Sequence, residues 1–370
     1  MAAGNSTGDR IVNLAQTRVI SRQIAALASR KWTFCSGLRM RQIFLLTVRI
    51  LVSGLLLYFA VRGIHLNDLW SRLAGTNLAW FASWMSLAIL ANLIQVFVGA
   101  MRWKEISALC HAPLGLLQAF RYNMIGTFFN QTLPSTIGGD AMRLWLVKHT
   151  GAGWRAATYS VLVDRAIGLI ALALLVVTSL PWSYDLIANT QGRLALVAVD
   201  IAAVSAGLGF LVLGALRWPW LKSWWPTHHL HACAVIVNRL LFSRATGPKI
   251  AALSITIHVL TVVISWCVVR SILAPAQFEQ MFLLVPPVAL ITMLPVSIAG
   301  WGLREATMML AFGYSGLNQA DGTMVSLLTG VTSFVVGAIG GLVWIFSREK
   351  AETPDGRIPD TELSEASPSS

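Results

Sequence analysis

The segment LPSTIGGDAMR spans residues 133–143 and returns 161 positions later as LPVSIAGWGLR at residues 294–304. Five of the eleven positions are identical, and Thr136 is matched by Ser297. Each copy opens on Leu-Pro, continues through small residues and ends on arginine. Proline breaks a helix because it lacks a backbone donor, and glycine permits tight turns. The repeated helix-breaking phrase predicts an internal repeat, which an inverted arrangement would place on opposite sides of a membrane.

Around both copies the chain is strongly apolar. Hydrophobic residues make up 56% of it and charged residues 12%, against roughly 25% charged in soluble domains; the mean hydropathy is +0.66. Several windows reach the roughly 20 residues that cross a bilayer as helix. We therefore expect an all-α integral membrane protein, a polytopic bundle of about seven or eight transmembrane helices. The apolar segments lie near residues 43–61, 78–100, 119–132, 157–180, 194–216, 250–273, 280–299, 306–317 and 324–346.

Segments next to the repeated phrase are the irregular ones. Those near 119–132 and 306–317 are short, and the one ending at 299 is interrupted by Pro286, Pro287 and Pro295. Irregular backbone at membrane depth needs protein or a water-filled cavity to satisfy it. We expect 119–139 to be a re-entrant element, while 280–317 is either two crossings or a re-entrant pair plus one.

The net charge of +12 comes from Lys and Arg gathered between apolar runs, mainly in residues 1–42, 101–118, 140–156 and 217–249. This pattern sets membrane orientation and does not indicate nucleic acid. It predicts a multi-pass protein of the plasma membrane, the inner membrane in a bacterium, with a cytoplasmic N-terminus. We expect the basic segment 1–42 to be a surface helix on anionic lipid, a disordered tail, or an over-extended start that precedes a working beginning at Met40. The membrane domain is 43–346, and 347–370 is a solvated tail.

Cysteine and histidine give no sign of a metal centre. Cys35, Cys110, Cys233 and Cys267 are far apart, so we expect free thiols. The tryptophan-rich stretch WPWLKSWW, residues 218–225, suits the headgroup level of a membrane. The histidines that follow, His228, His229 and His231, have no Cys or carboxylate partner at ligand spacing and are expected to be solvated or to face headgroups.

The repeated phrase has two interpretations. Asp140 follows two glycines and is expected to be a helix N-cap, with Arg143 one turn on. Half-helix N-termini direct their positive ends at anions, and arginine suits phosphate. Arg143 and Arg304 would then cradle one lipid phosphate. Alternatively, the breaks are ordinary helix ends and both arginines anchor at the interface.

Charges inside apolar runs mark further candidates. Asp164 and Arg165 lie within such a run, where a charge costs roughly 2.5–3.5 kcal/mol and usually faces the bundle interior. As neighbours they point about 100° apart, so they do not pair with each other. We expect one of them to meet Arg143 or Asp140, and Glu305 to pair with Arg165.

Two other polar residues lie in the middle of apolar segments. Asp200 and His258 are expected to be satisfied structural groups, in preference to functional ones.

The blocks RWKEISAL (102–109), FNQTLPSTIGGDAMRLWLV (129–147), SVLVDRAIGL (160–169) and LPVSIAGWGLREA (294–306) resemble the membrane region of lysylphosphatidylglycerol synthases and their stand-alone flippase-like relatives. The similarity spans roughly residues 45–346. It implies an integral membrane fold with re-entrant helices, and a role in moving a lipid across the bilayer. Carried over by position, the site candidates are Arg143, Arg304, Arg165 and Asn130 for a phosphate or headgroup; Asp140, Asp164 and Glu305 as gating or proton partners; and Pro134, Gly138, Gly139, Pro295 and Gly300 as helix breaks.

We therefore expect a lipid translocase for a phosphate-bearing lipid such as an aminoacyl-phospholipid, a polyprenyl-linked sugar or a hopanoid-related lipid. The synthase chemistry is not expected, because 24 residues after the last apolar segment are too few for a catalytic domain. No Walker-type phosphate loop is present, so we expect neither ATP nor another cofactor, and no enzymatic activity. One alternative is a non-transporting partner of a lipid- or glycan-modifying enzyme. Another is a polyprenyl-phosphate enzyme, which would need clustered carboxylates around a cation.

Overall fold

A computed structural model describes residues 77–132, 138–216, 225–293 and 300–347, with the isolated positions Thr47, Leu51, Gly54, Leu55 and Tyr58. All regular structure within these residues is helical, as predicted. The expectations for the basic segment 1–42, the polar tail beyond Ser347, Pro134, Pro295, Cys35 and the tryptophan-rich residues 218–224 lie outside the described residues.

The helices follow one another along the chain with short connections. They are α3 (Leu78–Leu109), α4 (Leu116–Thr132), α5 (Gly138–Val147), the π-helix η1 (Lys148–Ala152), α6 (Gly153–Leu186), α7 (Thr190–Ala215), α8 (Trp225–Leu241), α9 (Gly247–Ser271), α10 (Phe278–Thr292), α11 (Leu303–Tyr314) and α12 (Gln319–Phe346). Five stretches in the described part are long and apolar enough to cross a membrane: α3, the stretch Gly138–Leu186, α7, α9 and α12. The chain is thus a polytopic helical membrane protein.

The order of helix lengths repeats. Helices α3 to α6 run long, short, short, long, and α9 to α12 follow the same order. Each short pair, α4–α5 and α10–α11, is separated by one copy of the phrase, and α3, α4 and α6 fall near α9, α10 and α12 when shifted by 161 positions. The internal repeat predicted from eleven residues therefore extends over most of the described chain.

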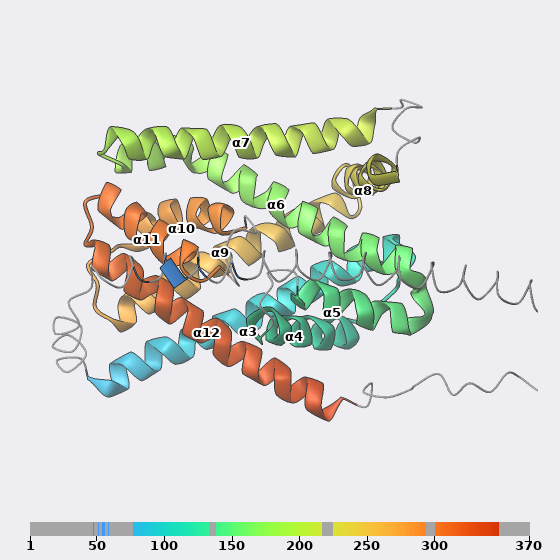
Figure 1. Cartoon of the computed structure of the whole chain (residues 1–370), viewed down its shortest axis with the longest axis horizontal. Helices are drawn as coiled ribbons and strands as arrows, with labels where there is room; N and C mark the ends of the chain where they lie inside the picture. Colours follow the sequence, from blue (N-terminus) through green and yellow to red (C-terminus); the bar gives the residue numbers. More distant parts are fainter. Residues whose placement is uncertain are drawn as a thin grey trace, which may run out of the picture.

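Equivalent helices of the two halves run in opposite directions. The indole nitrogen of Trp80, at the start of α3, donates to the carbonyl of Arg270 at the end of α9 (2.9 Å). At the other end of the pair, Lys249 Nζ lies 2.7 Å from Glu105 Oε1. Figure 1 shows α3 and α9, and likewise α6 and α12, crossing the bundle in opposite senses. The repeat is therefore inverted, because antiparallel equivalent helices are what an inverted repeat requires.

Small residues let α12 pack closely on both halves. A Cβ atom on Gly322 would lie 2.7 Å from the carbonyl oxygen of Met308 in α11, and one on Gly340 would meet the carbonyl oxygen of Met124 in α4. Close backbone approach of this kind drives helix association in membranes, where the hydrophobic effect between helices is weak. The N-terminal part of α12 thus packs on α11 and its C-terminal part on α4.

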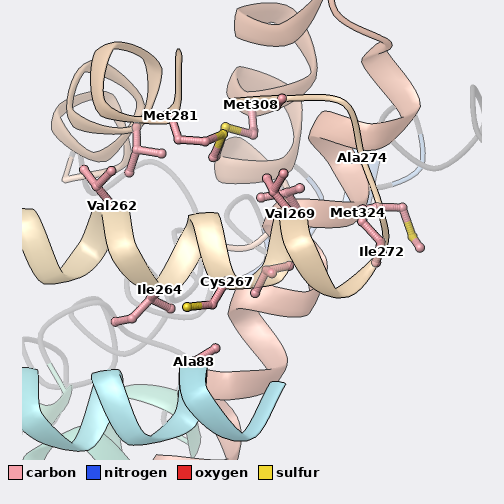
Figure 2. Close-up of a cluster of buried hydrophobic side chains, with 14 of the residues drawn as sticks. Ala88, Val262, Ile264, Cys267, Val269, Ile272, Ala274, Met281, Met308 and Met324 are labelled. Carbon is pink, nitrogen blue, oxygen red and sulfur yellow. The ribbon is translucent and has the colours of Figure 1, made fainter. Parts of the chain in front are cut away.

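An apolar core joins the long helices to the second short pair. Figure 2 shows Ala88 of α3 facing Ile264 and Cys267 of α9, with Met281 of α10 beside Met308 of α11. All five side chains are buried. This core fixes α10 and α11 against the antiparallel α3–α9 pair.

Candidate functional site

In the first short pair, the Gly-Gly of the phrase begins α5 and lies directly against α4. A Cβ atom on Gly139 would meet the carbonyl oxygen of Gly126 in α4, so only glycine fits there. The Gly139 backbone nitrogen donates to Asn130 Oδ1 (2.9 Å), which satisfies one donor at the N-terminus of α5. Helices α4 and α5 thus form a hairpin of short helices, and the re-entrant course expected for residues 119–139 stays a prediction. The N-cap prediction for Asp140 is wrong, because α5 begins at Gly138 and Asp140 lies inside its first turn.

The carboxylate of Asp164, in α6, is shared by two arginines. Arg143 NH2 lies 3.0 Å from Asp164 Oδ2, and Arg102 NH2 lies 2.9 Å from Asp164 Oδ1. All three residues are buried. Arg102 also donates to the hydroxyl of Ser254 in α9 (3.2 Å). The expectation that Asp164 or Arg165 meets Arg143 or Asp140 is thereby confirmed for Asp164. Together with the bonds of Arg102, the contact joins α3, α5, α6 and α9.

Arg165, the residue after Asp164 in α6, binds the other acid, Asp140. Arg165 Nε lies 2.7 Å from Asp140 Oδ2, and Arg165 NH2 donates to Asp140 Oδ1 (2.8 Å). Arg143 NH1 lies 3.3 Å from that same Oδ1. The two bonds between Arg165 and Asp140 form a bidentate contact, which is the strong geometry for an arginine and a carboxylate. As expected from their adjacency, Asp164 and Arg165 each bond to a different partner.

The charge cluster, defined as Arg102, Asp140, Arg143, Asp164 and Arg165, holds three cations and two anions. It therefore carries a formal charge of +1. The guanidinium of Arg143 also stacks 3.9 Å from the ring centroid of Trp103, while its buried Nε has no hydrogen-bond partner in the described structure. An uncompensated cation inside a membrane protein is costly unless an anion or water reaches it.

Sequence reasoning missed Arg102, Trp103 and Ser254. The sequence places residues 101–118 between two apolar runs, whereas α3 continues to Leu109 and carries Arg102 into the interior. The signal available was the apolar spacing of Trp103, Ile106 and Leu109, which keeps a helical period beyond Ala100. An arginine one residue before Trp103 would then lie on the helix and not at its end.

The second copy of the phrase forms a separate centre. Arg304 NH2 lies 3.1 Å from Glu305 Oε1, and Arg304 Nε donates to Ser326 Oγ of α12 (3.0 Å). The fully buried Glu305 also accepts from the Gly302 backbone nitrogen (2.6 Å) at the N-cap of α11. The predicted pair between Glu305 and Arg165 is wrong, because α11 uses this carboxylate to close its own N-terminus.

The two phrase arginines occupy equivalent positions but do not converge. Arg143 of α5 bonds to α6, and Arg304 of α11 bonds to the equivalent helix α12. Figure 1 places α5 and α11 in different parts of the bundle. Gly300 lies four residues before Arg304 and has a φ of +80°, a backbone conformation that favours glycine. Each arginine therefore belongs to its own cluster, and the structure does not bring them to one position.

A groove of about 860 Å³ runs between α6, α7 and α8 and touches Arg165. Its walls are mostly apolar, including Leu162, Leu169, Ile170 and Phe210. Its polar residues are Arg155, Arg165, Thr158, Tyr159 and His229, and the Tyr159 hydroxyl lies 2.6 Å from His229 Nδ1. The Arg165 side chain is 41% exposed, so the charge cluster opens to this groove through Arg165.

The prediction of a satisfied structural group has different outcomes for His258 and Asp200. His258 is satisfied as expected, with Nε2 2.9 Å from the carbonyl oxygen of Gly168. The same expectation is wrong for Asp200, which is 3% exposed and whose two carboxylate oxygens have no hydrogen-bond partner in the described part of the chain. Its neighbours on α7 are apolar, so no donor is supplied locally.

The histidines of α8 contact protein groups. His229 bonds to Tyr159, and His231 Nε2 lies 2.9 Å from the carbonyl oxygen of Leu216. Across the described residues, no three His, Cys, Asp or Glu side chains come together as a metal-binding group. Cys110, Cys233 and Cys267 are free thiols, as predicted, and all three are buried.

Comparison with known proteins agrees with this architecture. The family described as "Lysylphosphatidylglycerol synthase TM region" matches residues 46–341. These residues include both short helix pairs, the charge cluster and every helix that lines the groove. No curated protein matches the chain.

Proposed function

The chain belongs to the lysylphosphatidylglycerol synthase transmembrane-region family, and on this premise we propose that it is a lipid translocase. It moves a phosphate-bearing lipid between the leaflets of the plasma membrane, without catalysing a covalent reaction. Aminoacyl-phospholipids, polyprenyl-linked sugars and hopanoid-related lipids are the candidate substrates. The N-terminus lies in the cytoplasm, in keeping with the basic segments at one side of the membrane.

A single observation carries this proposal: a cation of the charge cluster opens onto an apolar groove. Arg165 lines the groove and remains 41% exposed while it contacts Asp140. Because the cluster has a formal charge of +1, an anion entering from the groove is attracted to it. Guanidinium groups bind phosphate through paired hydrogen bonds, as they do carboxylates.

The groove suits the rest of a lipid. Leu162, Leu169 and Ile170 line it on the α6 side, and Phe210 lines it on α7, so acyl chains remain in an apolar setting. The phosphate would take donors of Arg165 that now contact Asp140. Asp164 stays neutralised by Arg102 and Arg143 throughout. Replacing Asp140 by phosphate as the partner of Arg165 therefore costs little free energy inside the cluster.

The test is leaflet exchange of fluorescent phospholipids in liposomes containing the purified protein. Arg165→Gln should slow exchange at least tenfold, because it removes the cation that faces the groove. Arg239→Gln is the matched control, an exposed arginine of α8 that does not line the groove. It should exchange lipid at the wild-type rate.

A second pair of variants tests the groove itself. Gly207 lines it, and a Cβ atom there meets nothing within 4 Å, so Gly207→Leu should fold and obstruct the path. Gly209 lies on the same helix with equally open space but outside the groove lining, which makes Gly209→Leu the control. Equal exchange by both variants would remove the groove from the mechanism. Absence of exchange in folded wild type would instead favour a non-transporting partner of a lipid-modifying enzyme.

A further inference from the structure

Asp200 is an unpaired acid deep in a membrane-crossing helix. It lies ten residues after the start of α7, which corresponds to about 15 Å of helix, half the thickness of a hydrocarbon core of about 30 Å. The residue is 3% exposed, and neither carboxylate oxygen has a hydrogen-bond partner in the described structure. Ionisable residues at this depth face the bundle interior and mark ion or proton pathways.

Unlike Asp200, the acids near the two copies of the phrase have ion-pair partners. Asp140 and Asp164 are bonded to arginines, and Glu305 to Arg304, Ser326 and its own helix N-terminus. A carboxylate engaged with buried cations is not free to take up a proton without stranding those cations. Asp140, Asp164 and Glu305 were the expected proton partners; their ion pairs make each of them a poorer candidate than Asp200.

The position of Asp200 connects it to the groove. Ala203, Gly207 and Phe210 follow it at helical spacings of three, seven and ten residues, and all three line the groove. These spacings place them on the same face of α7 as Asp200. Asp200 therefore lies on the groove-facing side of α7, one helical turn before Ala203, the first lining residue of that helix.

We propose that Asp200 is the proton-binding group that couples lipid movement to a proton gradient. This inference rests on the proposed function. A proton passes from water on one side of the membrane to a carboxylate oxygen of Asp200. It leaves to water on the other side when the groove changes its opening. The neutral acid is compatible with the closed apolar setting, whereas the carboxylate needs water.

The charged groups around α7 leave Asp200 unpaired. From α6 and α8, the ionisable residues that line the groove are Arg155, Tyr159, Arg165, His229 and Cys233. Helix α10 has the exposed Glu279 in its first turn, outside the groove lining. None of them hydrogen-bonds to Asp200. The proton is thus the simplest ion that this site can hold, because a metal cation would need several oxygen ligands.

Proton binding is measured directly, without transport. Infrared difference spectra of the protein in nanodiscs, taken between acidic and alkaline buffer, should contain the carbonyl band of a protonated carboxyl group that Asp200→Asn removes. Asp185→Asn, which changes an exposed acid of α6, is the control and should keep the band. A spectrum unchanged by Asp200→Asn would overturn the proposal whatever the transport result.

Coupling is measured in the same liposomes that test lipid exchange. A pH gradient should change the wild-type exchange rate several-fold. The Asp200→Asn variant should exchange lipid at the same rate with and without the gradient. Exchange that ignores the gradient in wild type would overturn proton coupling and leave the translocase standing. A folded wild type that moves no lipid would remove the translocase and the coupling together, while the spectra would still report whether Asp200 binds a proton.

Discussion

Arg143 NH2 lies 3.0 Å from Asp164 Oδ2, although the two residues are 21 positions apart, and this bond ties α5 to α6. Arg102 reaches the same carboxylate from α3. Three helices therefore depend on one buried acid, and the charge cluster is a structural junction that reaches the groove through Arg165.

Asp164→Asn should lower the free energy of unfolding by about 3–5 kcal/mol, because it leaves the buried guanidinium of Arg102 without its anion and that of Arg143 with Asp140 alone. Unfolding in mixed detergent micelles, followed by circular dichroism, measures this. Asp185→Asn, at an exposed position of the same helix, should change stability little. Equal stabilities of the two variants would mean that water compensates the arginines.

Gly139→Ala should destabilise the hairpin of short helices by about 1–3 kcal/mol, since the new methyl group would collide with the Gly126 carbonyl and Asn130. Thermal unfolding of the purified variant checks this. Gly115→Ala is the matched change, because a Cβ atom there meets nothing within 4 Å. A hairpin that tolerates both changes would argue against close packing of α4 on α5.

Arg304 and Glu305 should behave as one energetic unit. Arg304→Met alone leaves the fully buried Glu305 carboxylate without its cation, whereas adding Glu305→Gln removes the stranded charge. We expect a coupling energy of about 0.5–3 kcal/mol between the two substitutions in a double-mutant cycle of unfolding. Strictly additive losses would show that Ser326 and Gly302 satisfy the carboxylate unaided.

The buried thiols should resist alkylation in the folded protein. Burial raises the pKa of the Cys110 thiol to about 12 and that of Cys233 to about 11. Because the thiolate is the nucleophile, a raised pKa leaves little reactive thiol at neutral pH and more as the pH rises. Mass spectrometry after iodoacetamide treatment should find both cysteines modified only in protein unfolded with detergent. Rapid labelling of the native protein at neutral pH would contradict this.

The sequence alone was sufficient for the architecture. Composition and apolar window lengths determine a helical membrane protein, because so few charged residues cannot cover a soluble domain of this size. The repeated phrase predicted an internal repeat, since Pro and Gly act locally on the backbone, and the antiparallel course of α3 and α9 then showed that it is inverted. The sequence could also indicate that Asp164 or Arg165 meets Arg143 or Asp140, because a charge in an apolar run requires a partner.

Only the tertiary structure decided which charges meet which. Arg102 enters the cluster because α3 crosses α6, Glu305 stays with its own helix terminus, and Asp200 receives no partner at all. Backbone breaks are encoded within a few residues, whereas an ion pair between helices depends on crossing positions that many distant side chains set together. The position of Arg165 on the groove is a result of that packing, and so is the separation of the two phrase arginines.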